Sequence, residues 1–268
     1  MQFDFGKNWD DFSKNALTAD SISQAKEHFD KLFSGIDIIG KSFVDIGFGQ
    51  GLSLLIASEK GAKTVGCDIN PKCKNVLEKN LVFFRDTKID AVQTIIGSIL
   101  KSEIVDVIKN CSPDRETSQY DIVHSWGVLH HTGKMWKAID NSMQLVEKDG
   151  WYIIAIYNKH WSSGLWNAIK WFYNISPGFL KWFMIKIFYV IISIAKFIVT
   201  GKNPFTQVRG MSFYYDIIDW LGGYPYEYAS VDEIKNYIEK QGFRLIRFNM
   251  PATPTGCNEF VFQKKGDQ

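Results

Sequence analysis

Cysteine is scarce in this chain and widely scattered. Its four cysteines, Cys67, Cys73, Cys111 and Cys257, lack the paired, close spacing of a zinc site or a short disulfide framework. We therefore expect no metal site, and a reducing compartment is the simpler environment for these thiols. Residues 1–7 also lack the basic and then apolar layout of a secretory signal, so the expected location is cytoplasmic.

Neither sign of charge dominates the sequence. The chain has 31 Lys and Arg against 29 Asp and Glu, which gives a formal net charge of +2. With this balance the protein as a whole is not attracted to nucleic acid or to an anionic surface. Any basic patch must therefore be local. We expect a small-molecule acceptor and no nucleic-acid partner.

Strand-like and helical segments alternate along much of the chain. Strands are expected at 42–46, 64–68, 94–99, 120–125 and 151–157, with helices at 52–58, 70–81, 104–109 and 134–145 between them. This alternation predicts an α/β fold, a Rossmann-like three-layer α/β/α sandwich with a mostly parallel sheet. After a helix at 231–240, the runs 243–250 and 258–263 suit an antiparallel hairpin at the sheet edge.

A glycine-rich loop follows the first expected strand, in the run DIGFGQG at residues 45–51. Gly47, Gly49 and Gly51 allow a sharp turn and a close approach of a ligand to the backbone. The helix that follows offers free amide donors and the positive end of its dipole. A carboxylate at Asp45 would repel a pyrophosphate but suits a cationic amino-acid ligand. An ordinary tight turn is the alternative explanation of the glycines.

An acidic residue ends the second expected strand. Asp68 follows Gly51 by 17 positions, near the spacing at which a carboxylate accepts hydrogen bonds from a ribose diol. Its alternative role is to cap the helix that begins at Asn70-Pro71. Together the loop and Asp68 favour an adenosine-containing ligand.

With these residues the chain resembles the class I methyltransferases that depend on S-adenosylmethionine (SAM). The resemblance rests on residues 45–51, on Asp68, on Gly97-Ser98-Ile99 and on residues 120–132 with their Leu-His-His end. It implies a seven-stranded sheet and SAM as cofactor, with S-adenosylhomocysteine as product. It also implies a cofactor site that includes Ile69, Ser98, Ile99, Ser125 and Trp126 besides the loop and Asp68. Ser98 departs from the pattern, because the family often has an acidic or amide residue there.

Two histidines follow the fourth expected strand on the side where a methyl acceptor would lie. Transfer from a sulfonium is an in-line displacement, and a hydroxyl acceptor must lose its proton. We favour His131 as the base, with His130 as the other candidate, because an imidazole accepts protons near neutrality. The alternative is that both histidines only cap or pack. Tyr157 and Asn158 follow the fifth strand and are candidates for the acceptor site, or simply begin a loop.

Residues 159–229 form an insertion between the core segments 41–158 and 230–268, and residues 1–40 form a helical segment before the core. Residues 179–199 resemble a membrane span, but Lys181, Lys186, Ser193 and Lys196 fall within roughly 140° on a helical wheel. The run without a charged residue, 187–195, is far shorter than the roughly 20 residues that a bilayer needs. We expect an amphipathic helix that covers the core as a lid, forms a homodimer, or makes peripheral membrane contact, in that order, and no transmembrane span.

Polar aromatics lie beside a cation in the second half of the insertion. Arg209 suits a phosphate or carboxylate, and Tyr214 and Tyr215 suit a sugar or the wall of a pocket. The segment looks like one from a bacterial subset of these methyltransferases, some of them encoded among surface-glycan genes. The favoured function is O-methylation of a small hydroxylated acceptor such as a sugar, sugar phosphate or capsule precursor.

Other functions stay open at this point. A quinone or lipid headgroup at a membrane surface is the alternative acceptor, and it would draw on the amphipathic helix. An NAD-dependent oxidoreductase is the alternative of another class, which Asp45 and the fourth-strand motif disfavour.

Overall fold

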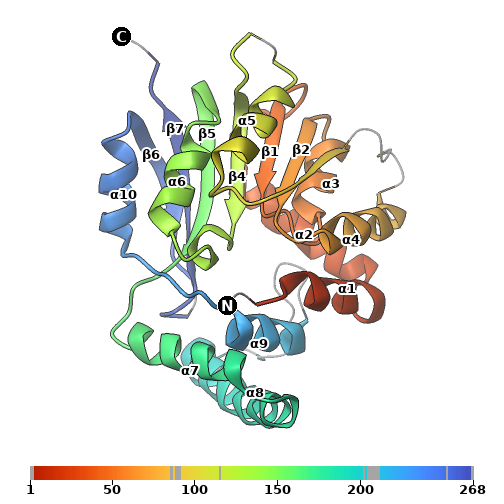
Figure 1. Ribbon diagram of the computed structural model, residues 1–268, viewed down its shortest axis with the longest axis vertical. Coiled ribbons are helices and arrows are strands. Elements are labelled where there is room, and N and C mark those ends of the chain that lie inside the picture. Colours follow the sequence, from red (N-terminus) through yellow and green to blue (C-terminus); the bar gives the residue numbers. More distant parts are fainter. Residues whose placement is uncertain are drawn as a thin grey trace.

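Seven strands form one sheet in the computed structural model, which describes residues 3–84, 87, 92–114, 116–201, 203, 212–251 and 253–266. The strands are β1 (Ser42–Ile46), β2 (Lys63–Asp68), β3 (Val92–Ile96), β4 (Tyr120–Trp126), β5 (Val146–Tyr157), β6 (Phe243–Asn249) and β7 (Cys257–Lys264). They lie in the order β3-β2-β1-β4-β5-β7-β6, and β7 runs antiparallel to both of its neighbours. The expected mostly parallel sheet with a terminal antiparallel hairpin is confirmed (Figure 1).

Helices cover both faces of the sheet (Figure 1). One layer contains α2 (Ala19–Leu32), α3 (Leu52–Glu59) and α4 (Lys72–Asn80), and the other contains α5 (Ser102–Asn110), α6 (Met135–Met143) and α10 (Val231–Glu239). Neighbouring strand residues serve opposite layers, because side chains alternate across a strand. Phe43 packs with the first layer and Val44 with the second. The three-layer sandwich is therefore confirmed.

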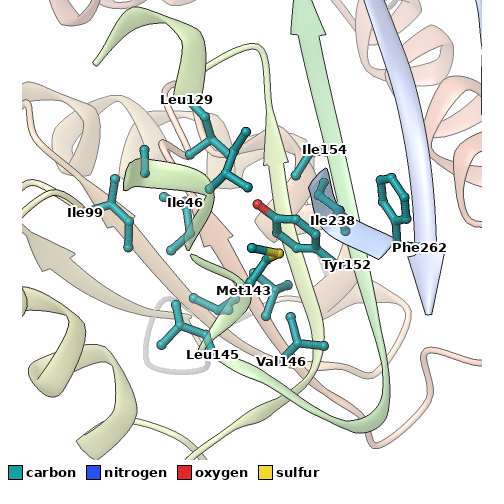
Figure 2. Packing of buried hydrophobic residues seen from close by; sticks show 14 of the residues in the cluster. Ile46, Ile99, Leu129, Met143, Leu145, Val146, Tyr152, Ile154, Ile238 and Phe262 are labelled. Atoms are coloured by element: carbon teal, nitrogen blue, oxygen red, sulfur yellow. The ribbon is translucent and has the colours of Figure 1, made fainter. Parts of the chain in front are cut away.

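The larger core cluster lies between the sheet and α5, α6 and α10. Figure 2 shows Tyr152 of β5 among Met143, Leu145 and Val146, with Ile238 of α10 nearby. The Tyr152 hydroxyl lies 2.6 Å from Ser142 Oγ on α6, so this buried polar group has a partner. This packing holds the strands in register and so places their carboxyl ends.

Four helices form a cap beyond the carboxyl ends of the parallel strands: α1 (Phe5–Asn15), α7 (Ser163–Ile175), α8 (Gly178–Thr200) and α9 (Phe213–Gly222) (Figure 1). The last three pack around their own apolar cluster, which includes Met184, Ile185, Ile217 and Leu221. Helix α1 contacts α4 and α9. The first forty residues thus divide between two layers, since α2 packs on the sheet and α1 joins the insertion.

Candidate active site

The glycine loop joins β1 to α3, and its glycines adopt left-handed backbone conformations. Gly47 has φ +77° and Gly51 has φ +80°. A Cβ at Gly47 would overlap Val128, and a Cβ at Gly51 would overlap Leu77. Both the backbone and the packing therefore require glycine here.

Asp68 at the end of β2 holds this loop in place. Its Oδ2 accepts a hydrogen bond from the Gly49 backbone N–H at 2.9 Å, and its Oδ1 accepts one from the Asn70 N–H at 2.8 Å. Burial raises the pKa of Asp68, and these backbone hydrogen bonds only partly oppose the rise. The carboxylate thus holds the Asn70 N–H, two residues before α4 begins, without capping the helix itself, and it also lines the cavity described next.

A cavity of about 1270 Å³ lies between the strand ends and the cap. Ligand sites commonly measure about 300–1,000 Å³, so this one has room for a cofactor and an acceptor together. Ten of the expected site residues line it: Asp45, Gly47, Gly49, Asp68, Ile69, Ser98, Ile99, Trp126, His131 and Tyr157. The structure therefore brings most of the expected cofactor residues to one cavity.

Six other expected residues do not line the cavity: Gly51, Ser125, His130, Asn158, Tyr214 and Tyr215. Ser125 Oγ instead donates to the Ile46 carbonyl at 2.8 Å, which ties β4 to β1. Asn158 Nδ2 donates a hydrogen bond to the Pro254 carbonyl, and its Oδ1 accepts one from Asn258 Nδ2. The expected Arg209 lies outside the described residues.

The two tyrosines of α9 point away from the acceptor side. The Tyr215 hydroxyl donates to Asp11 Oδ2 at 2.8 Å and its ring packs edge-on against Phe12, so this residue joins α9 to α1. The side chain of Tyr214 is exposed. Tyr215 therefore has a structural role in the cap, and neither tyrosine lines the cavity.

The two neighbouring histidines have different surroundings. His131 lines the cavity, and its Nδ1 lies 2.7 Å from the Pro225 carbonyl oxygen. Nδ1 must carry the proton to donate to that carbonyl, so Nε2 is the acceptor nitrogen. Burial and the charge of Lys170 lower the pKa of His131 to about 3, so the ring is neutral at physiological pH. His130 is fully buried, and its Nδ1 accepts from the Tyr157 N–H at 3.3 Å.

Two carboxylates on the cavity wall have side-chain partners that the sequence did not reveal. Asp45 Oδ1 lies 2.8 Å from His124 Nδ1, and both residues are buried. Glu259 of β7 accepts from Trp126 Nε1 at 2.8 Å and pairs with His28 Nε2 at 2.8 Å. Burial by itself would raise the pKa of Glu259, but its hydrogen bonds lower it to about 2. These carboxylates favour a cationic ligand, as expected for Asp45 from the sequence.

The cap supplies a further acidic side chain and a buried lysine. Asp219 of α9 lines the cavity and accepts a hydrogen bond from Asn8 Nδ2 at 2.7 Å. Burial raises its pKa well above the usual range. Lys170 of α7 is fully buried and donates to the Trp220 carbonyl, and burial lowers its pKa to about 7. Lys170 stands in no recognisable motif, whereas Asp219 opens the run DWLGGYP at residues 219–225, in the segment that resembles the bacterial subset.

Aromatic rings surround the Lys170 ammonium. Its Nζ lies 4.8 Å from the ring centre of Tyr226, 5.2 Å from that of Trp220 and 5.4 Å from that of Tyr157. Such rings attract a cation through their negative faces. Tyr157 and Trp220 also line the cavity, so the Lys170 ammonium packs directly behind this part of the cavity wall.

Comparison with known proteins bears on the family of this chain. Residues 22–247 match the family described as "Methyltransferase domain". No match was found among curated proteins. The fold is similar to that of magnesium protoporphyrin IX methyltransferase from Synechocystis PCC 6803 with bound SAH, with TM-score 0.53, 13% identity, and coverage of 91% of this chain and 83% of that one.

Two further solved structures share the fold. An O-methyltransferase family protein from Burkholderia thailandensis has TM-score 0.56 and 11% identity, over 97% of this chain and 60% of that one. A SAM-dependent methyltransferase from Anabaena variabilis ATCC 29413 has TM-score 0.54 and 11% identity, over 97% of this chain and 93% of that one. The cavity has the size and the carboxylates that SAM requires, and the family match covers most of the chain. The chain therefore belongs to the SAM-dependent methyltransferases of class I, with SAM as its cofactor.

Proposed function

We propose that this methyltransferase transfers the methyl group to a hydroxyl oxygen of a small acceptor, held between the glycine loop and the cap. The observation that carries the proposal is the neutral His131 ring, whose Nδ1 is committed to the Pro225 carbonyl while Nε2 is the acceptor nitrogen. A hydrogen-bond acceptor at this point in the cavity suits a hydroxyl donor on the acceptor molecule.

Bound SAM supplies an electrophilic methyl group on a sulfonium. An acceptor oxygen that took this methyl group from the sulfur would become strongly acidic and would have to lose its proton. His131 Nε2 then takes the hydroxyl proton. The pKa of His131, about 3, lies below the near-neutral value expected from the sequence, so the ring accepts this proton only as methylation makes the oxygen acidic. The carboxylates of Asp45 and Glu259 favour the cationic reactant over its neutral product.

A sugar, sugar phosphate or capsule precursor is the acceptor class that we propose first. Lys196 of α8 lines the cavity and would attract a phosphate, with Trp166 and Trp220 beside the same space. Aromatic rings also suit the apolar face of a sugar. The structural neighbours do not choose among acceptors, since their names include a porphyrin methyltransferase and an O-methyltransferase family protein.

A quinone or lipid headgroup is the second candidate acceptor. Its support is the apolar wall that α8 contributes to the cavity through Ile192, Ala195 and Val199. An acceptor with an apolar body would bury itself against this wall.

A methyl-transfer screen tests the proposal. The protein is incubated with SAM and separate sets of hydroxylated sugars, sugar phosphates and quinols, and release of S-adenosylhomocysteine is measured. We expect turnover with one of these sets and an O-methylated product by mass spectrometry and NMR. Methylation at nitrogen or carbon in the active set would overturn the O-transfer assignment.

A further inference from the structure

The outward side of α7 and α8 is an exposed apolar surface. On α8 it follows a helical stripe of Phe179, Phe183, Ile187, Val190, Ile194 and Ile198. Phe179 is 76% exposed, and Trp161, just before α7, is 88% exposed. Water-facing apolar patches of this extent are rare on soluble proteins unless they bind something. We call these seven exposed side chains, six on α8 and Trp161 before α7, the α7–α8 face.

The opposite side of α8 is committed to the cap. Met184 and Ile185 are buried in the cluster with Ile217 and Leu221 of α9. Lys181 and Lys196 lie beside this inner side, over the rings of Tyr173 and Phe213. The sequence predicts one apolar side for α8, but the structure shows a second one turned outward. The helix can therefore cover the cavity and still offer an apolar surface.

By length and composition the segment Gly178–Val199 is apolar enough to cross a membrane, with a mean hydropathy of 2.0. Its packing favours a different position. Helix α8 packs against α7 and α9 through Met184 and Ile185, so leaving the cap to span a bilayer would expose Ile217 and Leu221. A helix held in this way can lie flat at the boundary between headgroups and acyl chains.

The sequence of this region is basic. Between Asp149 and Asp216 it holds seven Lys or Arg and no Asp or Glu, although Lys170 is buried and Lys159 pairs with Glu233. Lys186 is exposed on α8, with its Nζ 5.7 Å from the ring centre of Trp182. Tryptophan and lysine side by side are typical of membrane interfaces, and basic residues are attracted to anionic headgroups. Protein–protein interfaces are instead depleted in lysine.

We propose that the α7–α8 face docks on an anionic lipid bilayer, with α8 lying in the interface. The exposed aromatic and aliphatic side chains enter the acyl boundary, while Lys186 meets lipid phosphate. Since Ile192, Ala195 and Val199 of the same helix line the cavity, docking places the cavity beside the membrane. This surface goes beyond the proposed reaction, because binding to lipid requires no methyl transfer.

Vesicle flotation with the full chain tests docking. We use vesicles of phosphatidylcholine alone and vesicles with phosphatidylglycerol added. We expect binding to the anionic vesicles, weaker binding in high salt, and little binding to the neutral ones. The double variant Phe179→Glu/Phe183→Glu should lose at least about tenfold in vesicle partition, since two inserted aromatic rings are replaced by anions.

A matched control uses apolar residues elsewhere that are similarly exposed. Ile39 is 75% exposed and Val82 is 74% exposed, and neither belongs to α7 or α8. Ile39→Glu/Val82→Glu should bind vesicles as the parent does. Thermal unfolding and SAM binding by calorimetry, both without lipid, show that each variant is folded and separate a docking failure from a failure of the proposed reaction.

Three results would overturn the proposal. The first is a folded parent protein that does not float with anionic vesicles. The second is resistance of the membrane-bound protein to alkaline carbonate extraction, which would mean that α8 spans the bilayer. The third is a dimer in light scattering that the Phe179/Phe183 variant abolishes while vesicle binding persists, since that face would then join two copies of the chain.

Discussion

Asn8 on α1 donates a hydrogen bond to Asp219 on α9 at 2.7 Å, across 211 positions of sequence. Asn8 is itself buried, and its Nδ2 also lies 3.4 Å from the Tyr215 carbonyl. Burial raises the pKa of Asp219 and the bond from Asn8 lowers it. The N-terminal helix therefore stabilises the carboxylate that the cap presents to the cavity.

Asn8→Leu removes this donor and leaves a buried carboxyl group without it. The free energy of unfolding should fall by about 1–3 kcal/mol, the usual cost of such a loss. The deficit should be constant at acid pH and grow once pH exceeds the raised folded pKa of Asp219, because the Asn8 donor stabilises the ionised form and the unfolded chains of parent and variant titrate alike. Denaturant unfolding at several pH values measures both effects. Asn15→Leu, which removes an exposed bond to Asp11 on the same helix, is the control; equal losses in both variants would contradict a special role for Asn8.

Asp68→Asn should weaken SAM binding by about tenfold to a hundredfold. The carboxylate accepts from the Gly49 and Asn70 N–H groups, and hydrogen bonds to charged groups are worth about 1.5–3 kcal/mol. Calorimetric titration with SAM measures the loss. Asp121→Asn is a matched control at the other end of β4, where the carboxylate accepts from the Ser42 N–H at 2.9 Å. The control should lose stability and keep its SAM affinity; unchanged affinity in Asp68→Asn would remove that residue from the cofactor site.

Gly47→Ala should destabilise the loop because the new Cβ would overlap Val128 at φ +77°. Gly127 has φ +73° but open space around it, so Gly127→Ala reports the backbone strain alone. We expect a loss of about 1–2 kcal/mol for Gly127→Ala and more for Gly47→Ala. Adding Val128→Ala should recover the difference, as measured by thermal unfolding and SAM binding. No recovery would mean that the overlap is not the cause.

His131→Asn should lower kcat by about a hundredfold or more and leave SAM affinity unchanged, because asparagine can still donate to the Pro225 carbonyl but lacks the Nε2 acceptor. Since the pKa of His131 is about 3, protonation of this ring should not reduce the parent rate between pH 8 and pH 5. Rate measurements with an acceptor from the screen test both statements. His160→Asn, outside the cavity lining, should behave as the parent does, and full activity of His131→Asn would leave that histidine only a structural role.

Lys170→Met should change stability in a pH-dependent way. The pKa of Lys170 is about 7 in the folded protein, so between pH 7 and about 10.4 the unfolded chain binds a proton that the folded one does not. The stability of the parent therefore rises over this window, and burying the charge costs most below pH 7. The gain of the variant over the parent should be larger by several kcal/mol at pH 6 than at pH 10. Chemical denaturation across pH measures it, with Lys186→Met as the control for loss of a lysine charge; a pH-independent difference would contradict the lowered pKa.

Segments with a clear local pattern could be predicted closely. The first strand was expected at 42–46 and is Ser42–Ile46, because an apolar run ended by glycines has few other solutions. The fifth strand was expected from 151 and begins at Val146. The first residues of β5 include the exposed Lys148 and Asp149, so this part of the strand lacks the apolar run from which a strand is predicted. Helix α7 carries aromatic residues on all sides, so it lacks the one-sided apolar pattern from which a helix is predicted.

The sequence by itself determined the layered α/β fold, the glycine loop, Asp68 at a strand end and the histidine pair, since each depends on residues close together in the chain. Only the tertiary structure decided which histidine faces the cavity, that Ser125 turns inward, and that α1 and α9 meet through Asn8 and Asp219. It also left the outer side of α8 uncovered. The physical reason is that local patterns select backbone conformations, whereas the direction and partners of a side chain follow from packing between segments that are up to two hundred residues apart.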